Sequence, residues 1–581
     1  MTTTRSGFTK LAAVCIAILL GAVVWELGWP LTRAEHEWSR LIAAVATLGH
    51  LTGILGSYFR KEINRPSLRL LIFQIISCLM IFLLIAREHQ EAGYMRFTEL
   101  SRLVITAGLI AIPTLMSLTR IFEWLVGKQK KGRPLMAPAM QFVASLGVVI
   151  LAGTGLLLLP NSTYPGITLS FTDALFTSTS AVCVTGLNAV DFAHTFTPLG
   201  EMFTLALIQI GGFGIMTFAY FVAMVAGQGF SLRDRVLLTD LLDEDNLGAV
   251  VSFITTIVVS TLFIELCGAV LLYFSWEGKD INLMGEPLWW HSLFHSVSAF
   301  CNAGFSTFPM NLMEPGIRLC YSGQAVIMAL IVCGGLGFGI YKEINSRLAN
   351  RFFSKHRRLH MQWTPYFKLV MISTGILLAG GALAIFAVSS PHAAEPLGEH
   401  LWICLFDSVT ARTAGFNITD YGRYLPAASL IMCGLMMVGG SPGGTAGGMR
   451  TTTCAIAGAE ILRILRGRDH VEFFRRRIDQ RTVARCVITV VVSCAWIGCF
   501  TVLICALEPS MSSLDIFFEN CSAFATVGVS RGITPDLSGP SKYLLIVNML
   551  AGRVGLFAFL SALAGPPTPR NYRDPSVKIP V

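Results

Sequence analysis

The sequence predicts an all-α integral membrane protein in which a unit of helix, re-entrant pore loop and helix is used four times around an axis. Four extra N-terminal transmembrane helices precede the four units. Three observations lead to this class. Of the 581 residues, 53% are hydrophobic and only 14% are charged, and the mean hydropathy is +0.63, whereas an average soluble chain has about 25% charged residues. The apolar residues form blocks long enough to cross a bilayer, and four shorter apolar stretches recur at a nearly constant spacing.

Charge and cysteine content exclude other classes. The chain has 44 Lys and Arg against 35 Asp and Glu, a formal net charge of +9. The basic residues lie in short loops between apolar blocks, so membrane topology explains them better than nucleic-acid binding does. The fifteen cysteines form no Cys-x-x-Cys pair, and most of them lie inside apolar runs. We therefore expect no nucleic-acid partner, no disulfide framework and no cysteine metal site.

Twelve segments are candidates for membrane spans, because a bilayer core of about 30 Å needs roughly 20 apolar residues per helix. They lie near 11–30, 41–58, 69–86, 103–126, 136–160, 200–227, 249–274, 322–346, 364–388, 426–460, 482–507 and 541–563. No small-residue cleavage site follows the first segment, which therefore reads as a retained span rather than a signal peptide.

The basic residues orient these spans. One alternate set of loops, which includes both termini, holds 28 Lys and Arg, and the other set holds 10. Because cytoplasmic loops carry the excess of positive charge, we expect both termini in the cytoplasm. One missed or extra helix would reverse half of this pattern, so the asymmetry supports the number twelve.

Four of the outside loops contain an apolar stretch too short to span, followed by small residues and one glycine. The four stretches read FTDALFTSTSAVCVTGL, SLFHSVSAFCNAGF, CLFDSVTARTAGF and DIFFENCSAFATVGV. Their glycines are Gly186, Gly304, Gly415 and Gly528, at spacings of 118, 111 and 113 residues. A full helix before and after each stretch makes this an internal repeat. We predict accessory helices over 1–130, pore repeats over 136–228, 249–347, 363–470 and 482–565, and a cytoplasmic tail over 566–581.

The stretches also share residues at fixed offsets from the glycine. A Phe stands ten residues before it in repeats one, two and four, and a Ser stands six before it in the same repeats. The third repeat is one residue shorter between Phe406 and Gly415. Hydroxyl side chains behind the glycines can anchor the pore helices; they are Thr177, Ser178, Thr179, Ser180, Ser298, Thr410 and Ser522.

A short helix that ends partway through the membrane, followed by extended chain, makes a cation site. Irregular backbone at that depth is tolerated only where it lines a polar cavity. The carbonyl end of the helix carries partial negative charge, and the carbonyls of the extended chain replace the water shell of the ion. The predicted filter residues are Cys183, Val184, Thr185, Gly186, Cys301, Asn302, Ala303, Gly304, Thr413, Ala414, Gly415, Ala525, Thr526, Val527 and Gly528.

The second helix of the third repeat is predicted to be broken. Six of the ten residues from Gly439 to Gly448 are glycine, with Pro442 among them. Gly costs about 1 kcal/mol and Pro about 3 kcal/mol in a helix interior. The residues that we assign to the break are Gly439, Gly440, Ser441, Pro442, Gly443, Gly444, Thr445, Gly447 and Gly448. An alternative is close helix packing through the Gly444–Gly448 pair.

Arg553 lies inside the last span, where a charge costs at least ~2.5 kcal/mol unless it faces a cavity or a partner. Facing the cavity, its positive charge would raise the barrier for a cation and support gating. The alternative is an ion pair with Glu265, an acid deep in another span. We assign Arg412, beside the third filter segment, a scaffold role with Asp407 or Glu519.

The motifs CVTGL, CNAGF, RTAGFN and ATVGVS resemble the four filter segments of the Trk/Ktr/HKT superfamily of potassium transporters, and most of all the bacterial Ktr membrane subunit. The resemblance covers about residues 136–565. It implies a pseudo-tetrameric pore, a homodimer in the bacterial inner membrane, and K⁺ preference from four filter glycines. It also implies that the Gly-rich segment is a gate and that Arg553 is the pore arginine of the family.

The resemblance further implies a separate cytosolic ring that senses nucleotide. The chain itself lacks a Gly-x-Gly-x-x-Gly motif after a strand and is expected to bind no nucleotide. The basic loops 342–363 and 463–481 are candidate docking surfaces, although positive-inside bias and anionic lipid explain them equally well. The first four helices suggest only accessory packing or dimer contact.

Two rival functions stay open. A sodium-conducting or poorly selective transporter of the same fold would show equal Na⁺ and K⁺ flux, and Na⁺ coupling of K⁺ uptake is a further possibility of the family. A membrane-embedded enzyme would need acids or histidines converging at one depth. The pair His291 and His295 lies in a pore helix, where packing is commoner than metal ligation. We therefore predict a transporter and no enzyme.

Overall fold

The structure is a computed structural model that describes residues 7–32, single positions between 35 and 52, and the ranges 138–214, 250–353, 362–389 and 396–564. The predicted spans 69–86 and 103–126, the end of the span 200–227 and the tail 566–581 lie outside the described residues. Most of the accessory segment 1–130 lies outside them too, apart from α1 (Gly7–Gly28).

The same order of elements occurs four times along the described chain: a long helix, a shorter pore helix, an irregular segment and a second helix. The first set is α5 (Pro138–Leu157), α6 (Phe171–Val182) and α8 (Pro198–Phe213). The second is α11 (Val250–Trp276), α12 (Leu288–Cys301) and α14 (Tyr321–Leu336). The third is α16 (Pro365–Val388), α17 (Leu397–Thr410) and α18 (Pro426–Met437), and the fourth is α20 (Gln480–Leu507), α21 (Ser513–Ala525) and α22 (Gly539–Val554).

Shorter elements connect or extend these sets. Three helices follow second helices: α15 (Phe338–Phe353), α19 (Thr451–Leu465) and α23 (Leu556–Ala564). The connecting turns are η1 (Pro160–Ser162), α7 (Phe192–Thr195), η2 (Asn311–Met313), α13 (Pro315–Arg318) and η3 (Tyr421–Arg423). The described chain is not purely helical, because β1 (Glu472–Phe473) pairs antiparallel with β2 (Arg476–Arg477) in a small hairpin after α19.

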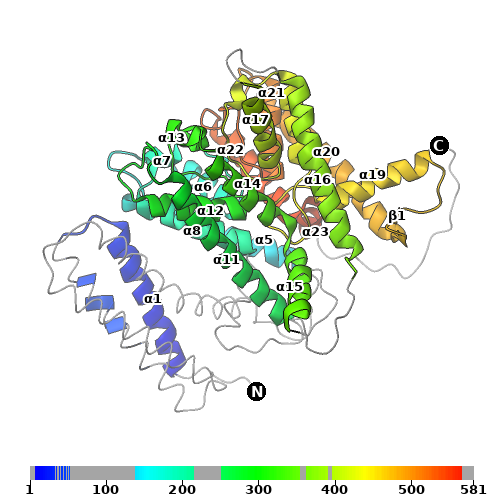
Figure 1. Cartoon of the computed structure of the whole chain (residues 1–581). Helices are drawn as coiled ribbons and strands as arrows, with labels where there is room; N and C mark the ends of the chain where they lie inside the picture. Colours follow the sequence, from blue (N-terminus) through cyan, green and yellow to red (C-terminus); the bar gives the residue numbers. More distant parts are fainter. Residues whose placement is uncertain are drawn as a thin grey trace.

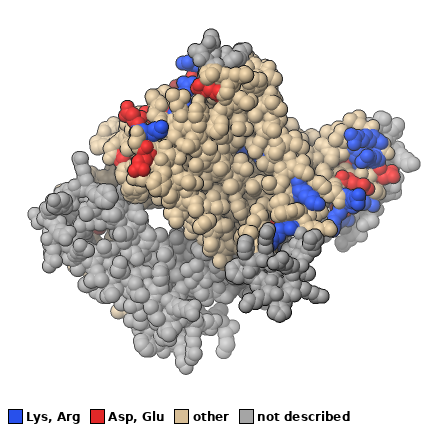
Figure 2. All heavy atoms as spheres, viewed as in Figure 1, with Lys and Arg blue, Asp and Glu red and all other residues tan. Residues whose placement is uncertain are grey.

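Among the described residues, three helices are long and apolar enough to cross a membrane, namely Ile254–Trp276, Pro365–Val388 and Gln480–Leu507. They expose large apolar side chains: Phe263 and Leu266 on α11 are 66% and 62% exposed, and Val502 on α20 is 69% exposed. Such surface suits contact with lipid rather than water. Figure 2 shows a broad uncharged surface over the body of the molecule. The number of twelve spans stays a prediction.

Two predicted spans are broken where the sequence indicated continuous helices. The span 322–346 divides at Gly337 into α14 and α15, which are bent by 93°. The span 541–563 divides at Gly555 into α22 and α23. Both glycines have φ near +90°, and so does Gly214 at the end of α8, at +75°. A glycine reaches this region without the steric cost of a Cβ atom, so three of the four second helices, α8, α14 and α22, end where such a glycine stands.

The four sets pack in a closed cycle of contacts, and Figure 1 shows their helices gathered in one body. Each pore helix contacts the long helix and the second helix of its own set, and also the second helix of the preceding set. Thus α12 packs on α8, α17 on α14, α21 on α18, and α6 on α22. The contact between α6 and α22 joins the last set to the first.

The apolar core follows the pore helices. The phenylalanines that stand nine or ten residues before the four glycines are Phe176, Phe294, Phe406 and Phe518, and all are fully buried. A buried Phe stabilises by about 1.5–3 kcal/mol relative to an exposed one. The repeated phenylalanine therefore fixes each pore helix against its neighbours and sets the position of the segment that follows.

Candidate functional site: a ring of four glycine segments

The chain takes the same backbone conformation after each pore helix. The four predicted filter glycines have φ of +91°, +71°, +81° and +95°. Two residues before each of them, a residue with a Cβ atom also has positive φ; these residues are Val184, Asn302, Thr413 and Thr526. This conformation is uncommon for any L-residue and costs most for β-branched ones. Three of the four are β-branched, so the surrounding packing must hold the strain.

The four glycines lie side by side in a closed ring. A Cβ atom placed on Gly186 would lie 2.3 Å from the carbonyl oxygen of Ala303, and one on Gly528 would lie 2.1 Å from that of Thr185. The remaining two positions continue the cycle. A Cβ on Gly304 would lie 2.7 Å from Ala414 O, and one on Gly415 would lie 2.8 Å from Val527 O. Each glycine therefore faces the main chain of the next repeat, and the fourth faces the first. None of the four positions has room for a side chain.

All fifteen predicted filter residues are buried. Five of them belong to helix ends: Cys301 and Ala525 are the last residues of α12 and α21, and the C-caps of α6, α12 and α21 are Cys183, Asn302 and Thr526. The carbonyl ends of the four pore helices thus come directly before the ring. Their partial negative charge favours a cation there.

Hydroxyl side chains tie each segment to its pore helix, and they do so in two ways. Ser180 and Ser522 accept hydrogen bonds from the N–H groups of Gly186 and Gly528, both at 3.0 Å. Ser298 and Thr410 instead donate to the carbonyls that follow the glycine, at Phe305 and Phe416, at 2.8 and 2.6 Å. Of the other predicted anchors, Ser178 and Thr179 donate to Ile150 O and Leu175 O, and the Thr177 hydroxyl is buried without a partner.

The Gly-rich segment lies against this ring. Helix α18 ends at Met437 and α19 begins at Thr451, so the segment between them is non-helical, as the composition predicts. A Cβ on Gly447 would lie 1.9 Å from the Thr526 hydroxyl, and one on Gly448 would lie 3.2 Å from Ala525. The Thr445 hydroxyl donates to Phe300 O at 3.2 Å. The segment therefore touches the second and fourth repeats where their pore helices end.

The same segment is bonded to the break in the second repeat. Ser441 N donates to Gly335 O at 2.9 Å, and Phe338 N donates to Gly443 O at 3.0 Å. The Tyr366 hydroxyl donates to Pro442 O at 2.9 Å. A side chain on Gly444 would press on Gly334 and Gly335. Close packing therefore requires small residues here. Hydrogen bonds also fix the backbone of the segment, which forms no helix.

Arg553 bonds to backbone carbonyls and not to an acid. Its Nη1 donates to Thr445 O in the Gly-rich segment, and its Nη2 donates to Gly211 O in α8. The alternative partner, Glu265, accepts from Gln209 at 3.1 Å and from the Cys301 thiol at 3.6 Å. The ion pair between Arg553 and Glu265 is therefore wrong, and the charge of Arg553 lies between two repeats and the Gly-rich segment.

The scaffold partners predicted for Arg412 are also wrong. Asp407 accepts from the Tyr421 and Tyr424 hydroxyls. Glu519 accepts from Ser530 and Thr534 and from the N–H of Arg531. The Arg412 side chain is buried, and its Nη1 has no hydrogen-bond partner. Both acids instead secure the segments that follow the third and fourth glycines.

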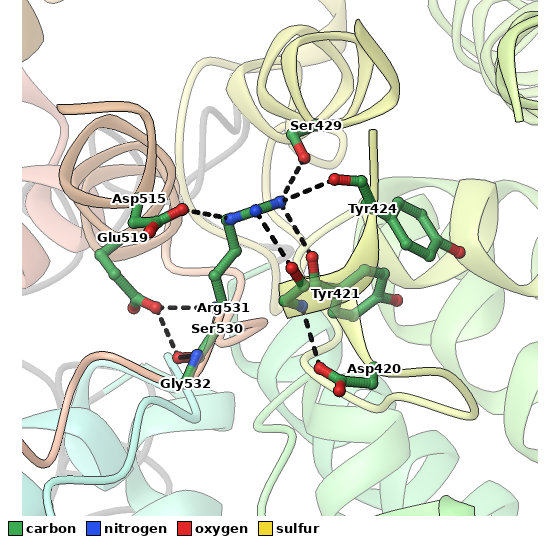
Figure 3. A network of polar contacts seen from close by, with 10 residues as sticks. Asp420, Tyr421, Tyr424, Ser429, Asp515, Glu519, Ser530, Arg531 and Gly532 are labelled. Carbon is green, nitrogen blue, oxygen red and sulfur yellow. Dashed lines mark hydrogen bonds and ion pairs between the residues drawn. The ribbon is translucent and has the colours of Figure 1, made fainter. Parts of the chain in front are cut away.

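A cluster around Arg531 was not predicted (Figure 3). This arginine stands three residues after Gly528, and its Nε donates to Asp515 at 2.5 Å. Its Nη1 donates to Ser429 at 2.6 Å and to Tyr421 O at 2.9 Å, and its Nη2 donates to Gly422 O at 3.2 Å. One side chain thereby joins the fourth repeat to the third. Its partners in the third repeat lie some hundred residues away in sequence, so no local pattern could indicate them.

This cluster is one of four polar contacts that form an outer ring. In each contact, the fourth residue of a second helix meets the next repeat's pore helix or its outer loop. The contacts are Trp290 with Glu201 at 2.7 Å, Trp402 with Gln324 at 2.6 Å, Arg531 with Ser429 at 2.6 Å, and Asp173 with Lys542 at 2.9 Å. The chemistry differs at every joint, although the position is the same. The outer ring fastens the repeats together near the starts of the pore helices.

The two histidines of α12 hold the segment that follows Gly304. His291 Nδ1 accepts from the Thr307 hydroxyl at 2.6 Å, and His295 Nε2 accepts from the Ser306 hydroxyl at 2.9 Å. The opposite ring nitrogens face the carbonyls of Leu283 and His291. All four nitrogens are thus used in hydrogen bonds, and in the described part of the chain no group of three His, Cys, Asp or Glu could hold a metal ion.

Comparison with known proteins defines the class to which this fold belongs. A sequence model of the TrkH family, described as "Cation transport protein", matches residues 104–568. The chain therefore belongs to the TrkH family of cation transport proteins, and the resemblance seen in the filter motifs is confirmed. It is a multi-pass membrane protein, and its family consists of transporters and not of enzymes.

Individual relatives extend over most of the chain. It is 34% identical over 431 residues to the Ktr system potassium uptake protein B of Bacillus subtilis (strain 168), covering 72% of this chain and 91% of that protein. It is 32% identical over 446 residues to the potassium/sodium uptake protein NtpJ of Enterococcus hirae, covering 75% and 94%. The crystal structure of the potassium transporter TrkH from Vibrio parahaemolyticus matches with a TM-score of 0.59 at 18% identity, over 84% of this chain and 96% of that one.

Proposed function

We propose that the chain takes up potassium ions across the plasma membrane by passing them through the ring of Gly186, Gly304, Gly415 and Gly528. The observation that carries this proposal is the closed cycle of contacts, in which each glycine lies 2.1–2.8 Å, measured from an added Cβ, from a carbonyl oxygen of the next repeat. Backbone oxygens of four segments at one place can replace the water shell of an alkali ion. The printed names of the relatives, which are potassium uptake proteins, support the same ion.

The work of the ring is electrostatic and needs no covalent step. Four pore-helix C-termini place partial negative charge beside the ring, and the hydroxyl anchors hold the segments at a fixed distance. Because the four glycines are in close contact and no side chain fits between them, the width of the ring is fixed. A dehydrated ion that fits loses little relative to its water shell, whereas a smaller ion is less well bound.

In this proposal the segment 439–448 acts as a gate, and Arg553 holds the gate closed. The segment packs against the ends of two pore helices, and Arg553 bonds to it through Thr445 O. A fixed positive charge at this place raises the barrier for a cation. Opening would then require the segment to leave both the ring and Arg553.

We further propose the cellular setting. Both termini face the cytoplasm, and the chain forms a homodimer that binds a separate cytosolic nucleotide-sensing ring. Exposed arginines over α19 and the β1–β2 hairpin, gathered at one side in Figure 2, support the loop 463–481 as a docking surface. Anionic lipid is the alternative occupant of these arginines.

A second candidate is a transporter that passes both K⁺ and Na⁺, either together or as coupled ions. The printed name of the Enterococcus hirae relative, a potassium/sodium uptake protein, favours it. The two candidates share the ring and differ in how strongly it discriminates.

Growth of a K⁺-uptake-deficient bacterium at low K⁺ tests the proposal, with Rb⁺ and Na⁺ uptake measured in the same cells. Rescue with Rb⁺ uptake well above Na⁺ uptake is expected. Rescue with equal uptake of both ions would favour the second candidate. Well-expressed protein that gives neither rescue nor uptake of either ion, alone or with a related regulatory subunit, would overturn both.

A further inference from the structure

One joint of the outer ring differs from the other three because it brings two acids together. Glu201, in the first turn of α8, belongs to the first repeat, and Glu286, just before α12, belongs to the second. Their carboxyl groups lie within hydrogen-bond reach of each other. Glu201 is 2% exposed, and the side chain of Glu286 is 8% exposed. Of the described Lys and Arg residues, none forms an ion pair with either acid.

The surroundings of the pair supply hydrogen-bond donors. Trp290 Nε1 donates to Glu201 at 2.7 Å. The other titratable groups that face the pair are His291, whose Nε2 lies 3.9 Å from Glu286 Oε2, and Tyr164. That Nε2 is already engaged with Leu283 O at 3.1 Å. Glu286 Oε2 is fully buried, and it has no hydrogen-bond partner because the nearby His291 nitrogen bonds to Leu283 O instead.

Two buried carboxylates in contact cannot both be ionised at little cost, so they share one proton. Burial raises the pKa of Glu286 to about 7, although its hydrogen bond to Glu201 acts in the opposite direction. Burial also raises the pKa of Tyr164, and the two acids raise it further. A metal ion fits the pair poorly, because an indole N–H and an imidazole N–H face it where a metal would need oxygen ligands.

We propose that Glu201 and Glu286 form a proton-binding site that fastens the first repeat to the second, and that loss of its proton at rising external pH lowers ion uptake. The coupling to uptake rests on the proposed function, whereas proton binding does not. With the proton bound, one acid donates to the other across the joint. Without it, two negative charges meet inside the protein and push α8 away from α12.

A short chain of contacts connects this site with the filter. His291 lies beside Glu286 and accepts from Thr307, three residues after Gly304. Helix α8 also reaches the ring at its other end, because a Cβ on Gly212 would lie 2.4 Å from the Cys301 sulfur. A change of spacing between α8 and α12 is therefore passed to the second filter segment.

Thermal unfolding of the purified full-length protein, followed between pH 5 and pH 8, tests the proton site without reference to transport. The folded pKa of Glu286 lies above the value of about 4.3 in an unfolded chain, so the folded state holds the extra proton. Its stabilisation is complete below pH 4.3 and is lost as pH rises toward 7. We expect the Tm of the parent to fall over this interval and the fall to be clearly smaller in Glu286→Gln. The exposed Glu277→Gln, in the same loop, should follow the parent.

Uptake of Rb⁺ at external pH 6 to 8 tests the coupling. For a pKa of about 7, the protonated population falls about tenfold over this range. The uptake of the parent and of Glu277→Gln should fall with it, by up to about tenfold. Glu286→Gln should stay at one level, because its amide donates to Glu201 at every pH. Glu201→Gln should behave in the same way.

The outcomes separate the parts of the proposal. Equal pH profiles of Tm in the parent and both Gln variants would overturn the proton site. Different Tm profiles with equal uptake profiles would overturn the coupling. Stabilisation of the parent, and not of Glu286→Gln, by Na⁺ or Ca²⁺ at constant pH would show a metal site instead. Absence of any Rb⁺ uptake at every pH would contradict the proposed function while the Tm profiles still decide the proton site.

Discussion

The substitution Gly186→Ser tests the ring most directly, because the structure contains a matched control. Gly186 and Gly166 both have φ of +91°, so a serine at either position meets the same backbone strain of about 1–3 kcal/mol. At Gly186 the new Cβ would lie 2.3 Å from Ala303 O, whereas at Gly166 it meets nothing within 4 Å. The difference between the two variants therefore measures the contact with the ring alone.

The size of the effect follows from these distances. Ordinary contact of a Cβ begins near 3.4 Å, so Ala303 O, at 2.3 Å, must move by about 1 Å. In the proposed filter this carbonyl helps to fit the ion. A loss of only 1.4 kcal/mol in the preference for the larger ion lowers discrimination tenfold. We expect Gly186→Ser to lose at least about tenfold in the ratio of Rb⁺ to Na⁺ uptake, and Gly166→Ser to keep the parent's ratio.

Uptake is measured in the K⁺-uptake-deficient bacterium at matched membrane expression, with growth at low K⁺ as a second readout. Gly528→Ser, whose Cβ would lie 2.1 Å from Thr185 O, should repeat the result from the other side of the first repeat. If Gly186→Ser and Gly528→Ser both keep the parent's growth and its discrimination, the four glycines do not form the filter.

Three further predictions concern the gate and the outer ring. Deletion of residues 440–448 should raise Rb⁺ uptake, and unchanged or lower uptake by well-expressed protein would count against the gate. Arg553→Gln should raise uptake in the closed state, because it removes the positive charge and keeps one donor for a carbonyl; a fall would assign Arg553 to ion conduction instead. Arg531→Ala should destabilise the protein by about 3–5 kcal/mol, seen as a lower Tm. Arg531→Lys should recover only part of that loss, since an ammonium cannot reproduce the fork of contacts; full recovery would show that charge alone matters.

The sequence predicts the parts of the site that repeat within short stretches. The glycines recur at 118, 111 and 113 residues, and the hydroxyls stand five or six residues before them, so both could be found without a structure. The break after Met437 follows from composition, because six glycines and a proline act together. A single glycine in an apolar helix gives no such signal, and for this reason the breaks at Gly337 and Gly555 were missed.

The parts that the sequence does not predict depend on packing. Val184, Thr413 and Thr526 have positive φ, which their β-branched side chains disfavour, and only the neighbouring repeats can impose it. The contacts of Arg531 with the third repeat and the pair of Glu201 with Glu286 join residues 85 or more positions apart. Their positions become visible only when the fourth residues of the four second helices are compared.

The inner ring has the same feature in all four repeats, whereas the outer ring has a different contact at each joint. At the inner ring every repeat presents a glycine with positive φ and a main-chain oxygen; in the proposed function, an ion on a common axis would interact with all four segments. At the outer ring the same positions hold an ion pair, an arginine cluster, a neutral hydrogen bond and an acid pair. In the acid pair, burial raises the pKa of Glu286 to about 7, and the pair lies beside His291, which bonds to the segment after Gly304.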